Sequence, residues 1–254
     1  PRRVQNNMKL LFISLGCDKN LVDSEEMLGM LAADGHQIVD DEDEAEVIIV
    51  NTCCFIGDAK EESVNTILEM AEKKKAGTCK VLIVTGCMAQ RYKKEISEEI
   101  PEVDAILGTT SYGDIIKAVK EAEAGRHFEE YKSIDFLPNI SGKRMLTTGG
   151  HFAYLKIAEG CDKHCTYCII PKLRGSYRSV PMEQLVKEAQ SLAEQGVKEL
   201  ILVAQETTLY GKDLYGKKSL HVLLKELCKI KGIRWIRILY CYPEEIYDEL
   251  IQTM

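Results

Sequence analysis

The sequence lacks any apolar run near the roughly 20 residues that a membrane-spanning helix needs. It also lacks an apolar stretch near its start, where Pro-Arg-Arg-Val-Gln-Asn-Asn is too polar for a secretory signal peptide. No low-complexity tract and no repeated segment is present, which excludes a solenoid. From these absences we expect a cytoplasmic protein that does not associate with a membrane.

What is present is a chain of 254 residues, 45% of them hydrophobic, which is enough to form a core. This length favours two domains. The chain contains ten cysteines. In the reducing compartment that we expect, cysteines serve as metal ligands or catalytic thiols more often than as disulfides.

Charge is distributed unevenly along the chain. Residues 1–125 contain 14 Lys/Arg and 24 Asp/Glu, a net charge of −10, whereas residues 126–254 contain 19 and 16, a net charge of +3. An acidic first half is a poor surface for a nucleic-acid backbone. It suits a basic protein partner, or it is simply a solvated acidic face.

Strand and helix patterns alternate throughout and predict an α/β fold with parallel sheets. In residues 1–125 the predicted strands are 8–15, 47–52, 80–85 and 105–107, with helices over 21–33, 58–76, 92–100 and 115–124. We interpret this part as a domain with an open parallel sheet. Periodicity fades over residues 126–150, which contain Pro138 and Gly149-Gly150, and we interpret them as a linker.

Residues 151–254 repeat the strand–helix order. The predicted strands are 152–158, 199–204 and 235–241, and the predicted helices are 182–195, 220–230 and 244–253. Three such units make only part of a barrel, which normally closes with eight strands. The chain stops within a helical pattern, so we expect the rest of the barrel to be missing.

The strongest motif is Cys161-x3-Cys165-x2-Cys168, directly after a predicted strand. Three thiolates on one loop can ligate three irons of a 4Fe-4S cluster and leave the fourth iron open. Structural zinc needs four ligands, and the only fourth candidate, His164, would be strained because it adjoins Cys165. Unligated buried thiols are a further alternative.

A second set of three cysteines emerges once the strands are placed. Cys17, Cys53 and Cys87 each follow a predicted parallel strand, at the edge where open α/β sheets form their sites. Chance placement is the alternative. The other cysteines are expected to be buried small hydrophobic residues: Cys54, Cys79, Cys228 and Cys241.

The loop around Cys161 resembles that of radical S-adenosylmethionine (SAM) enzymes, and the two cysteine sets in this order resemble the radical SAM methylthiotransferases. Within that family, residues 14–25 (SLGCDKNLVDSE), 50–53 (VNTC), 59–63 (AKEES) and 169–175 (IIPKLRG) are similar to the type that modifies a small-subunit ribosomal protein. The resemblance covers nearly the whole chain. It implies a first domain over 1–125, a radical SAM domain over 151–254, and a further C-terminal TRAM domain that is absent here.

The resemblance also implies a mechanism. A 4Fe-4S cluster on Cys161, Cys165 and Cys168 cleaves SAM, and the radical abstracts hydrogen from the β-carbon of an aspartate. Sulfur at a second 4Fe-4S cluster on Cys17, Cys53 and Cys87 then captures the carbon radical, and a second SAM supplies the methyl group. The implied partners are ribosomal protein uS12, or the small subunit, and an electron donor such as flavodoxin. Four residues are candidates for SAM binding: Tyr167, Arg178, Gln205 and Glu206.

Two other functions compete with this interpretation. One is methylthiolation of an adenosine in transfer RNA, against which the acidic first half and Asp18-Lys19-Asn20 argue. The other is a non-catalytic iron–sulfur or zinc protein. Iron content and SAM cleavage distinguish the latter from an enzyme.

Overall fold

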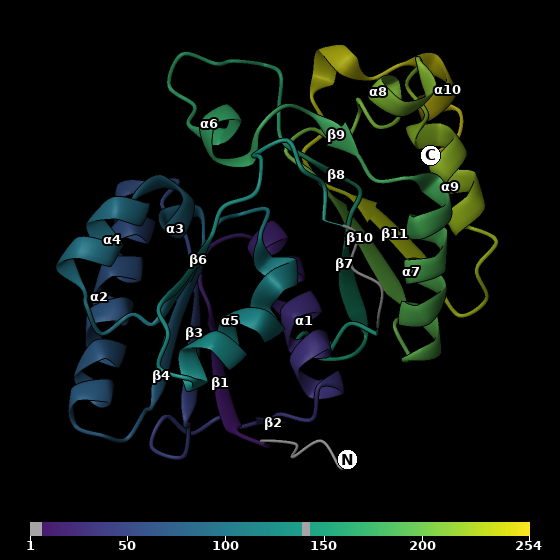
Figure 1. Cartoon of the computed structure of the whole chain (residues 1–254). Helices are drawn as coiled ribbons and strands as arrows, with labels where there is room; N and C mark the ends of the chain where they lie inside the picture. The colour runs from purple at the N-terminus through teal and green to yellow at the C-terminus, as the bar shows by residue number, and fades with distance from the viewer. Residues whose placement is uncertain (1–6, 139–142) are drawn as a thin grey trace. The chain divides into compact units, whose positions relative to one another are not determined.

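The computed structural model describes residues 7–138 and 143–254 and divides into two compact units, Pro1–Met145 and Leu146–Met254 (Figure 1). Residues 1–6, where no signal peptide was expected, and residues 139–142 of the predicted linker lie outside the described residues. Over the two described ranges, no helix combines the length and the apolar character needed to cross a bilayer.

The first unit is built on a parallel sheet of six strands in the order β2-β1-β3-β4-β5-β6. The strands are β1 (Lys9–Ser14), β2 (Gln37–Ile38), β3 (Val47–Thr52), β4 (Val81–Gly86), β5 (Ala105–Leu107) and β6 (Phe128–Glu130). The chain moves from β1 to β2 in one direction and then from β3 to β6 in the other. Strand order therefore reverses between β1 and β3, and such a reversal leaves a crevice at the carboxyl ends of the strands.

Helices cover both faces of this sheet (Figure 1). On one face lie α1 (Asp18–Ala33) and α5 (Ile115–Glu123), which follows the short η1 (Tyr112–Asp114), and on the other lie α2 (Gly57–Lys75), α3 (Cys87–Arg91) and α4 (Lys93–Glu99). Ile49 and Ile83 pack with α1 and α5, whereas the alternating Ile48 and Leu82 are buried on the opposite face. Because both faces are covered, the strands are continuous apolar runs.

The second unit has a parallel sheet of three strands in the order β11-β10-β7 and a separate antiparallel pair. The sheet contains β7 (Phe152–Lys156), β10 (Glu199–Val203) and β11 (Trp235–Ile238), and the pair contains β8 (Ala158–Glu159) and β9 (Arg178–Ser179). Its helices are α6 (Ile170–Arg174), α7 (Met182–Glu194), α8 (Lys212–Tyr215), α9 (Leu220–Leu227), η2 (Pro243–Glu245) and α10 (Asp248–Ile251). Leu155 and Leu202 share one core with Leu185 of α7 and Leu223 of α9.

The predicted α/β class, with an open parallel sheet in the first half, is confirmed. Among the described residues the second sheet is open, and no closed barrel is formed. Residues 126–150, where no regular periodicity was found, include β6, which pairs with β5 at the sheet edge.

The predicted helix over 244–253 is wrong. The structure has the two short helices η2 and α10, because Ile246 and Tyr247 between them are extended. The Tyr247 hydroxyl lies 3.0 Å from Nδ1 of His221 on α9, and the two rings meet edge to face. This packing outweighs the helical pattern of the sequence.

Candidate functional site

Cys17, Cys53 and Cys87 lie at one edge of the six-stranded sheet. Cys17 is the N-cap of α1 just beyond β1, Cys53 directly follows β3, and Cys87 directly follows β4 as the first residue of α3. These strands are neighbours in register, since Ser14 pairs with Asn51 and Thr52 pairs with Gly86. The structure thus places all three cysteines at the carboxyl ends of adjacent strands. Cys17 is exposed, whereas Cys53 and Cys87 are buried.

Two glycines let these chain segments approach one another. Gly16 has φ +93°, and a Cβ there would lie 2.6 Å from Cys53 Cβ and 2.9 Å from Cys53 Sγ. Gly86 has φ +95°, and a Cβ there would lie 2.5 Å from the carbonyl oxygen of Thr52. Any side chain would therefore push Cys17 or Cys87 away from Cys53.

Asn20 connects the three cysteine-bearing segments. Its buried Nδ2 donates to the carbonyl oxygens of Leu15 (3.1 Å) and Thr52 (3.0 Å), and its Oδ1 accepts a long contact from Cys87 Sγ at 3.9 Å. Asn20 belongs to the segment SLGCDKNLVDSE, but no local pattern in the sequence predicts these contacts. Only the fold brings the ends of β1 and β3 and the start of α3 to this one amide.

Ser63 of α2 positions the backbone of Cys53. The Cys53 N–H donates to Ser63 Oγ at 3.0 Å, and the same hydroxyl donates to the Cys53 carbonyl oxygen at 2.8 Å. The side chains of Asn20 and Ser63 thus fix the backbone of the segments that carry the thiols.

The cysteines outside the two sets were expected to be buried. Cys54 and Cys79 are buried, and burial raises the pKa of both thiols. Cys241 is half-buried, with Sγ 3.4 Å from Thr207 Oγ1. For Cys228 the prediction is wrong, because it caps the C-terminus of α9 and is exposed there.

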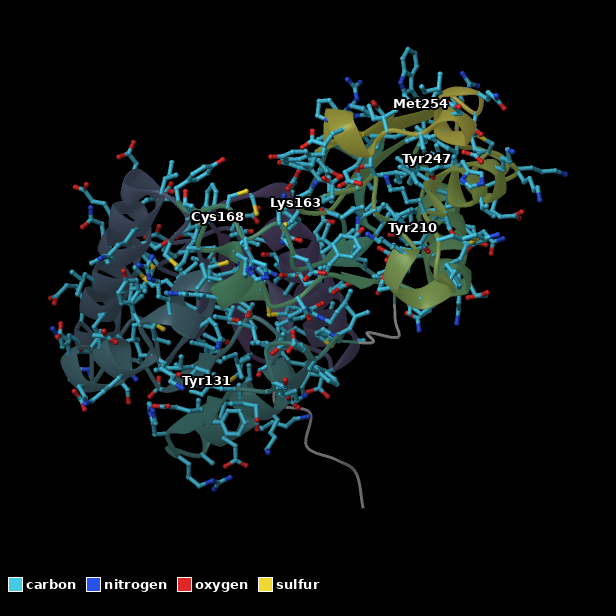
Figure 2. The ribbon with its side chains drawn as sticks, turned by 90° about the horizontal axis from the view of Figure 1, so that it is seen from above. Tyr131, Lys163, Cys168, Tyr210, Tyr247 and Met254 are labelled. Carbon is cyan, nitrogen blue, oxygen red and sulfur yellow. The ribbon has the colours of Figure 1, made fainter. Side chains whose placement is uncertain are left out.

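Cys161, Cys165 and Cys168 lie on the loop that follows β8, where Figure 2 labels Lys163 and Cys168. All three thiols are half-buried. The Cys161 N–H donates to the Gly175 carbonyl oxygen at 3.1 Å, and the Cys168 N–H donates to that of Cys165 at 3.0 Å. Gly160 has φ +76° and touches the backbone of Gly175 and Ser176, so the loop leaves β8 in a conformation that favours glycine.

Burial raises the pKa of the Cys161 thiol. A hydrogen bond from the Lys163 backbone lowers it, and the charges of Cys168, Cys165 and Glu206 raise it further. The Cys161 thiol therefore lies near the other two cysteines of its set. Binding iron would favour the thiolate form of Cys161.

Beneath this loop lies a buried ionic network centred on Glu159. Its carboxylate accepts from Arg174 Nη1 at 3.0 Å, Lys156 Nζ at 3.2 Å and Gln205 Nε2 at 2.9 Å. Although burial opposes the charge, Arg174 and Lys156 hold the pKa of Glu159 well below its usual range. This network joins β7, β8, α6 and the end of β10 directly beneath the cysteine loop.

We predict that Glu159→Gln lowers the free energy of unfolding of the second unit by about 3 kcal/mol, because it removes the negative charge that offsets the buried Lys156 and Arg174. Urea unfolding of the metal-free chain, followed by fluorescence of Trp235, the only tryptophan, measures this change. Glu226→Gln is the control, since Glu226 forms an exposed pair with Lys229 and its loss should cost under about 0.5 kcal/mol. Equal effects in the two variants would contradict a central role for Glu159.

Gln205 and Glu206 directly follow the β10 region, as predicted. Glu206 Oε1 accepts from the Thr208 N–H at 3.0 Å. Gln205 Oε1 and Glu206 Oε2 are also buried, and neither has a hydrogen-bond partner among the described residues. Buried acceptors without donors are costly, so these two atoms fit a ligand that carries N–H groups, such as the SAM ammonium.

The other two candidates for SAM binding differ in their surroundings. Tyr167 is 88% exposed, so its ring does not pack within the loop. Arg178 of β9 donates from Nη2 to the Arg174 carbonyl oxygen at 3.0 Å and from Nη1 to that of Ser176. Arg178 thus braces the turn between α6 and β9.

A carboxylate ties the cysteine loop to the segment after β11. Glu245 Oε1 lies 2.7 Å from Lys163 Nζ, and its Oε2 lies 2.8 Å from Lys218 Nζ. Hydrogen bonds from these two ammonium groups lower the pKa of Glu245 from 4.5 to about 2.

This lowered pKa predicts a pH-dependent contribution to stability. It is fully present above about pH 4.5 and is lost as the pH falls toward 2, because protonation removes the charge. In the metal-free chain, Glu245→Gln should therefore lower the free energy of unfolding by roughly 1 kcal/mol at pH 6. The difference from the unaltered chain should shrink in acid. A difference that stays constant down to pH 3, by Trp235 fluorescence, would contradict the assignment.

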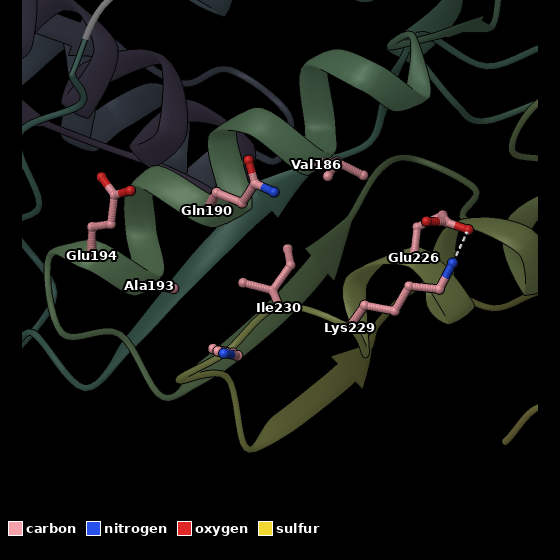
Figure 3. A pocket seen from close by; sticks show the side chains of 8 residues that line it. Val186, Gln190, Ala193, Glu194, Glu226, Lys229 and Ile230 are labelled. Carbon is pink, nitrogen blue, oxygen red and sulfur yellow. Dashed lines mark hydrogen bonds and ion pairs between the residues drawn. The ribbon is translucent and has the colours of Figure 1, made fainter.

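A pocket of about 590 Å³ lies away from these groups, between α7 and α9, and is lined by Val186, Gln190, Ala193, Glu194, Glu226, Lys229, Ile230 and Lys231 (Figure 3). These residues lie along α7, in the last turn of α9 and in the segment just after α9. Within residues 7–138 and 143–254, no three His, Cys, Asp or Glu side chains converge as they would around one metal ion. A 4Fe-4S cluster requires no such convergence, since each thiolate binds a different iron.

Comparison with known proteins found two family models, one in each half of the chain, and relatives that match nearly all of it. Residues 9–108 match a family described as uncharacterized protein family UPF0004, and residues 155–254 match the radical SAM superfamily. Over 247 residues the chain is 66% identical to a protein of Lachnoclostridium phytofermentans and 55% identical to one of Clostridioides difficile, both named ribosomal protein uS12 methylthiotransferase RimO. The chain is thus similar over 97% of its length to proteins named as methylthiotransferases, and its residues 155–254 match the radical SAM superfamily.

Each of these alignments covers 97% of the chain but only 56% of the relative, so the chain spans about half the length of these methylthiotransferases. Cys17, Cys53 and Cys87 fall within the first matched range, and Cys161, Cys165 and Cys168 fall within the second.

Solved structures show the same fold at low sequence identity. The radical SAM methyltransferase TsrM from Kitasatospora setae, with tryptophan and a SAM analogue bound, is 13% identical with a TM-score of 0.62, covering 98% of this chain and 57% of that one. The cobalamin-dependent radical SAM enzyme OxsB is 15% identical with a TM-score of 0.53, covering 89% and 37%. These similarities support the fold of this chain and carry no information about its substrate.

Proposed function

We propose that the protein adds a methylthio group to the β-carbon of an aspartate in ribosomal protein uS12, using SAM and two 4Fe-4S clusters. The observation that carries this proposal is the pair of three-cysteine sets, one at the carboxyl edge of the six-stranded sheet and one on the loop after β8. The names of the two relatives support the substrate. Residues 1–125 would carry the sulfur-donating site, 126–150 would link the domains, and 151–254 would carry the SAM site.

Cys161, Cys165 and Cys168 would hold the first cluster, whose bound form supplies the electron for SAM cleavage and an open iron. Gln205 Oε1 and Glu206 Oε2 would accept hydrogen bonds from the SAM ammonium, which fits their buried, unpartnered state among the described residues. The exposed Tyr167 ring would lie along the adenine, and the Arg178 guanidinium would face the carboxylate.

Cys17, Cys53 and Cys87 would hold the second cluster. Gly16 and Gly86 let the segments that carry Cys17 and Cys87 lie directly against the segment that carries Cys53, which fits three thiolates on one cluster. Asn20 would keep the three cysteine-bearing segments at the required spacing.

The net charge of −10 on residues 1–125 would attract a basic protein. A flavodoxin-like protein in the cytoplasm would donate the electron.

The test is to incubate the anaerobically reconstituted protein with SAM, a reductant and either uS12, small ribosomal subunits or transfer RNA. We expect the mass of one methylthio group to appear on uS12, free or in the subunit, and about eight irons per chain. A methylthio group on transfer RNA instead would establish the alternative substrate. Bound zinc without SAM cleavage would show a non-catalytic protein.

A further inference from the structure

Two cations lie near the crevice that contains Cys17, Cys53 and Cys87. They are on α2 and α3, the helices that follow Cys53 and Cys87. Lys60 is in the first turn of α2, which comes four residues after Cys53, and Arg91 ends α3, which begins at Cys87. Residues four apart in a helix share one face, so Arg91 lies one turn from Cys87 on the same side.

The ring of Tyr92 holds the two cations near each other. Lys60 Nζ lies 4.6 Å from the ring centroid and Arg91 Cζ lies 5.0 Å from it, both within the range of cation–π attraction.

Neither cation forms an ion pair with a carboxylate within the described ranges, although residues 1–125 contain 24 Asp and Glu. Other lysines of this unit do form such pairs, for example Lys73 with Asp43 at 2.7 Å and Lys74 with Asp104. Two neighbouring, exposed cations in a strongly acidic unit make a local site for an external anion.

Two exposed apolar side chains lie in the short segment between Cys54 and the start of α2. Phe55 is 54% exposed and Ile56 is 57% exposed. A free phosphate or other small anion would gain no binding energy from these apolar side chains. A peptide with an acidic side chain between apolar or aliphatic groups would contact both the cations and the apolar side chains. The anion that fits this surface is therefore a carboxylate carried by a polypeptide.

We propose that Lys60 and Arg91 bind the carboxylate of the aspartate that is modified, while Phe55 and Ile56 contact the residues beside it. This inference rests on the proposed function and assigns its substrate-binding groups. The net negative charge of the first unit attracts a basic partner protein. Lys60 and Arg91 then select one acidic side chain of that partner. The planar guanidinium of Arg91 offers paired N–H donors to both carboxylate oxygens.

The test uses uS12 peptides that each contain one aspartate, paired with peptides that have asparagine in its place. Fluorescence anisotropy measures their binding to the reconstituted chain. We expect the unaltered chain to bind one aspartate peptide about tenfold more tightly than its asparagine partner, as one charged hydrogen-bonding group is worth. The Lys60→Gln/Arg91→Gln variant should bind both equally, and Lys60→Arg should keep the preference.

Lys93→Gln is the matched control. Lys93 Nζ lies 4.8 Å from the Tyr131 ring centroid in the same unit, so the change removes a similar charge from an aromatic ring elsewhere. It should leave the tenfold preference intact. Thermal unfolding checks that all the variants are folded.

A double variant that still prefers the aspartate peptide would overturn this inference, as would an unaltered chain with no preference. It would also be overturned if the double variant lost affinity only for a ribosomal RNA oligonucleotide, which would assign the cations to phosphate. The proposed function fails separately, if the unaltered chain cleaves SAM but leaves uS12 unmodified.

Discussion

Replacing Cys161 with alanine is expected to reduce SAM cleavage to the background rate. Three thiolates are the minimum that keeps a cubane on this loop while leaving one iron open, and Cys161 is fixed by its own backbone hydrogen bond to Gly175. Under the proposed function, loss of one ligand would remove the cluster and, with it, the group that would cleave SAM. The proposed second cluster would have separate ligands and should remain.

The measurement is release of 5′-deoxyadenosine under reducing conditions, together with iron content. Iron should fall by roughly four from about eight per chain. Cys228→Ala is the control, because Cys228 is an exposed thiol of the same unit that ligates nothing in this scheme. If Cys161→Ala still released 5′-deoxyadenosine, the loop would not be the SAM-cleaving site.

Replacing Cys87 with alanine is expected to separate the two half-reactions. SAM cleavage should continue, because the loop after β8 is unchanged, whereas formation of the methylthio product should fall to background. Cys87 is buried at the end of β4, where its Sγ meets Asn20, so no other thiol can take its place without moving the strand.

The two products, 5′-deoxyadenosine and methylthiolated uS12, are quantified in the same reaction by mass spectrometry. Cys79→Ala is the matched control, since Cys79 is equally buried but lies before the start of β4, at the other end of that strand. It should change neither product. Full methylthio product from the Cys87 variant would show that the second cluster is held elsewhere.

Much of this architecture was predictable because its signals are local. Continuous runs such as Val47–Thr52 report a strand covered on both faces, and the structure confirms that strand with the predicted bounds. Once such strands are recognised as parallel, their carboxyl ends must share an edge, which is why Cys17, Cys53 and Cys87 could be grouped from positions 36 and 34 residues apart.

Other features depend on contacts between distant residues and left no local signal. The helix predicted over 244–253 breaks because Tyr247 packs on His221. Cys228 is exposed because α9 ends at Leu227 and leaves Cys228 as its C-cap. The buried ion pairs of Glu159 with Lys156 and Arg174 join three elements, and a single charged residue in the sequence does not show that it will be buried.

The sequence by itself determined the chemistry: which thiols occur, their spacing, and the strands that they follow. Only the tertiary structure decided the framework around those thiols, namely the amide of Asn20 between two strand ends, the Glu159 network, and the cations held on Tyr92. The physical reason is that periodicity and spacing encode local backbone geometry, whereas hydrogen bonds, ion pairs and ring contacts arise only when folding brings separate segments within a few ångströms.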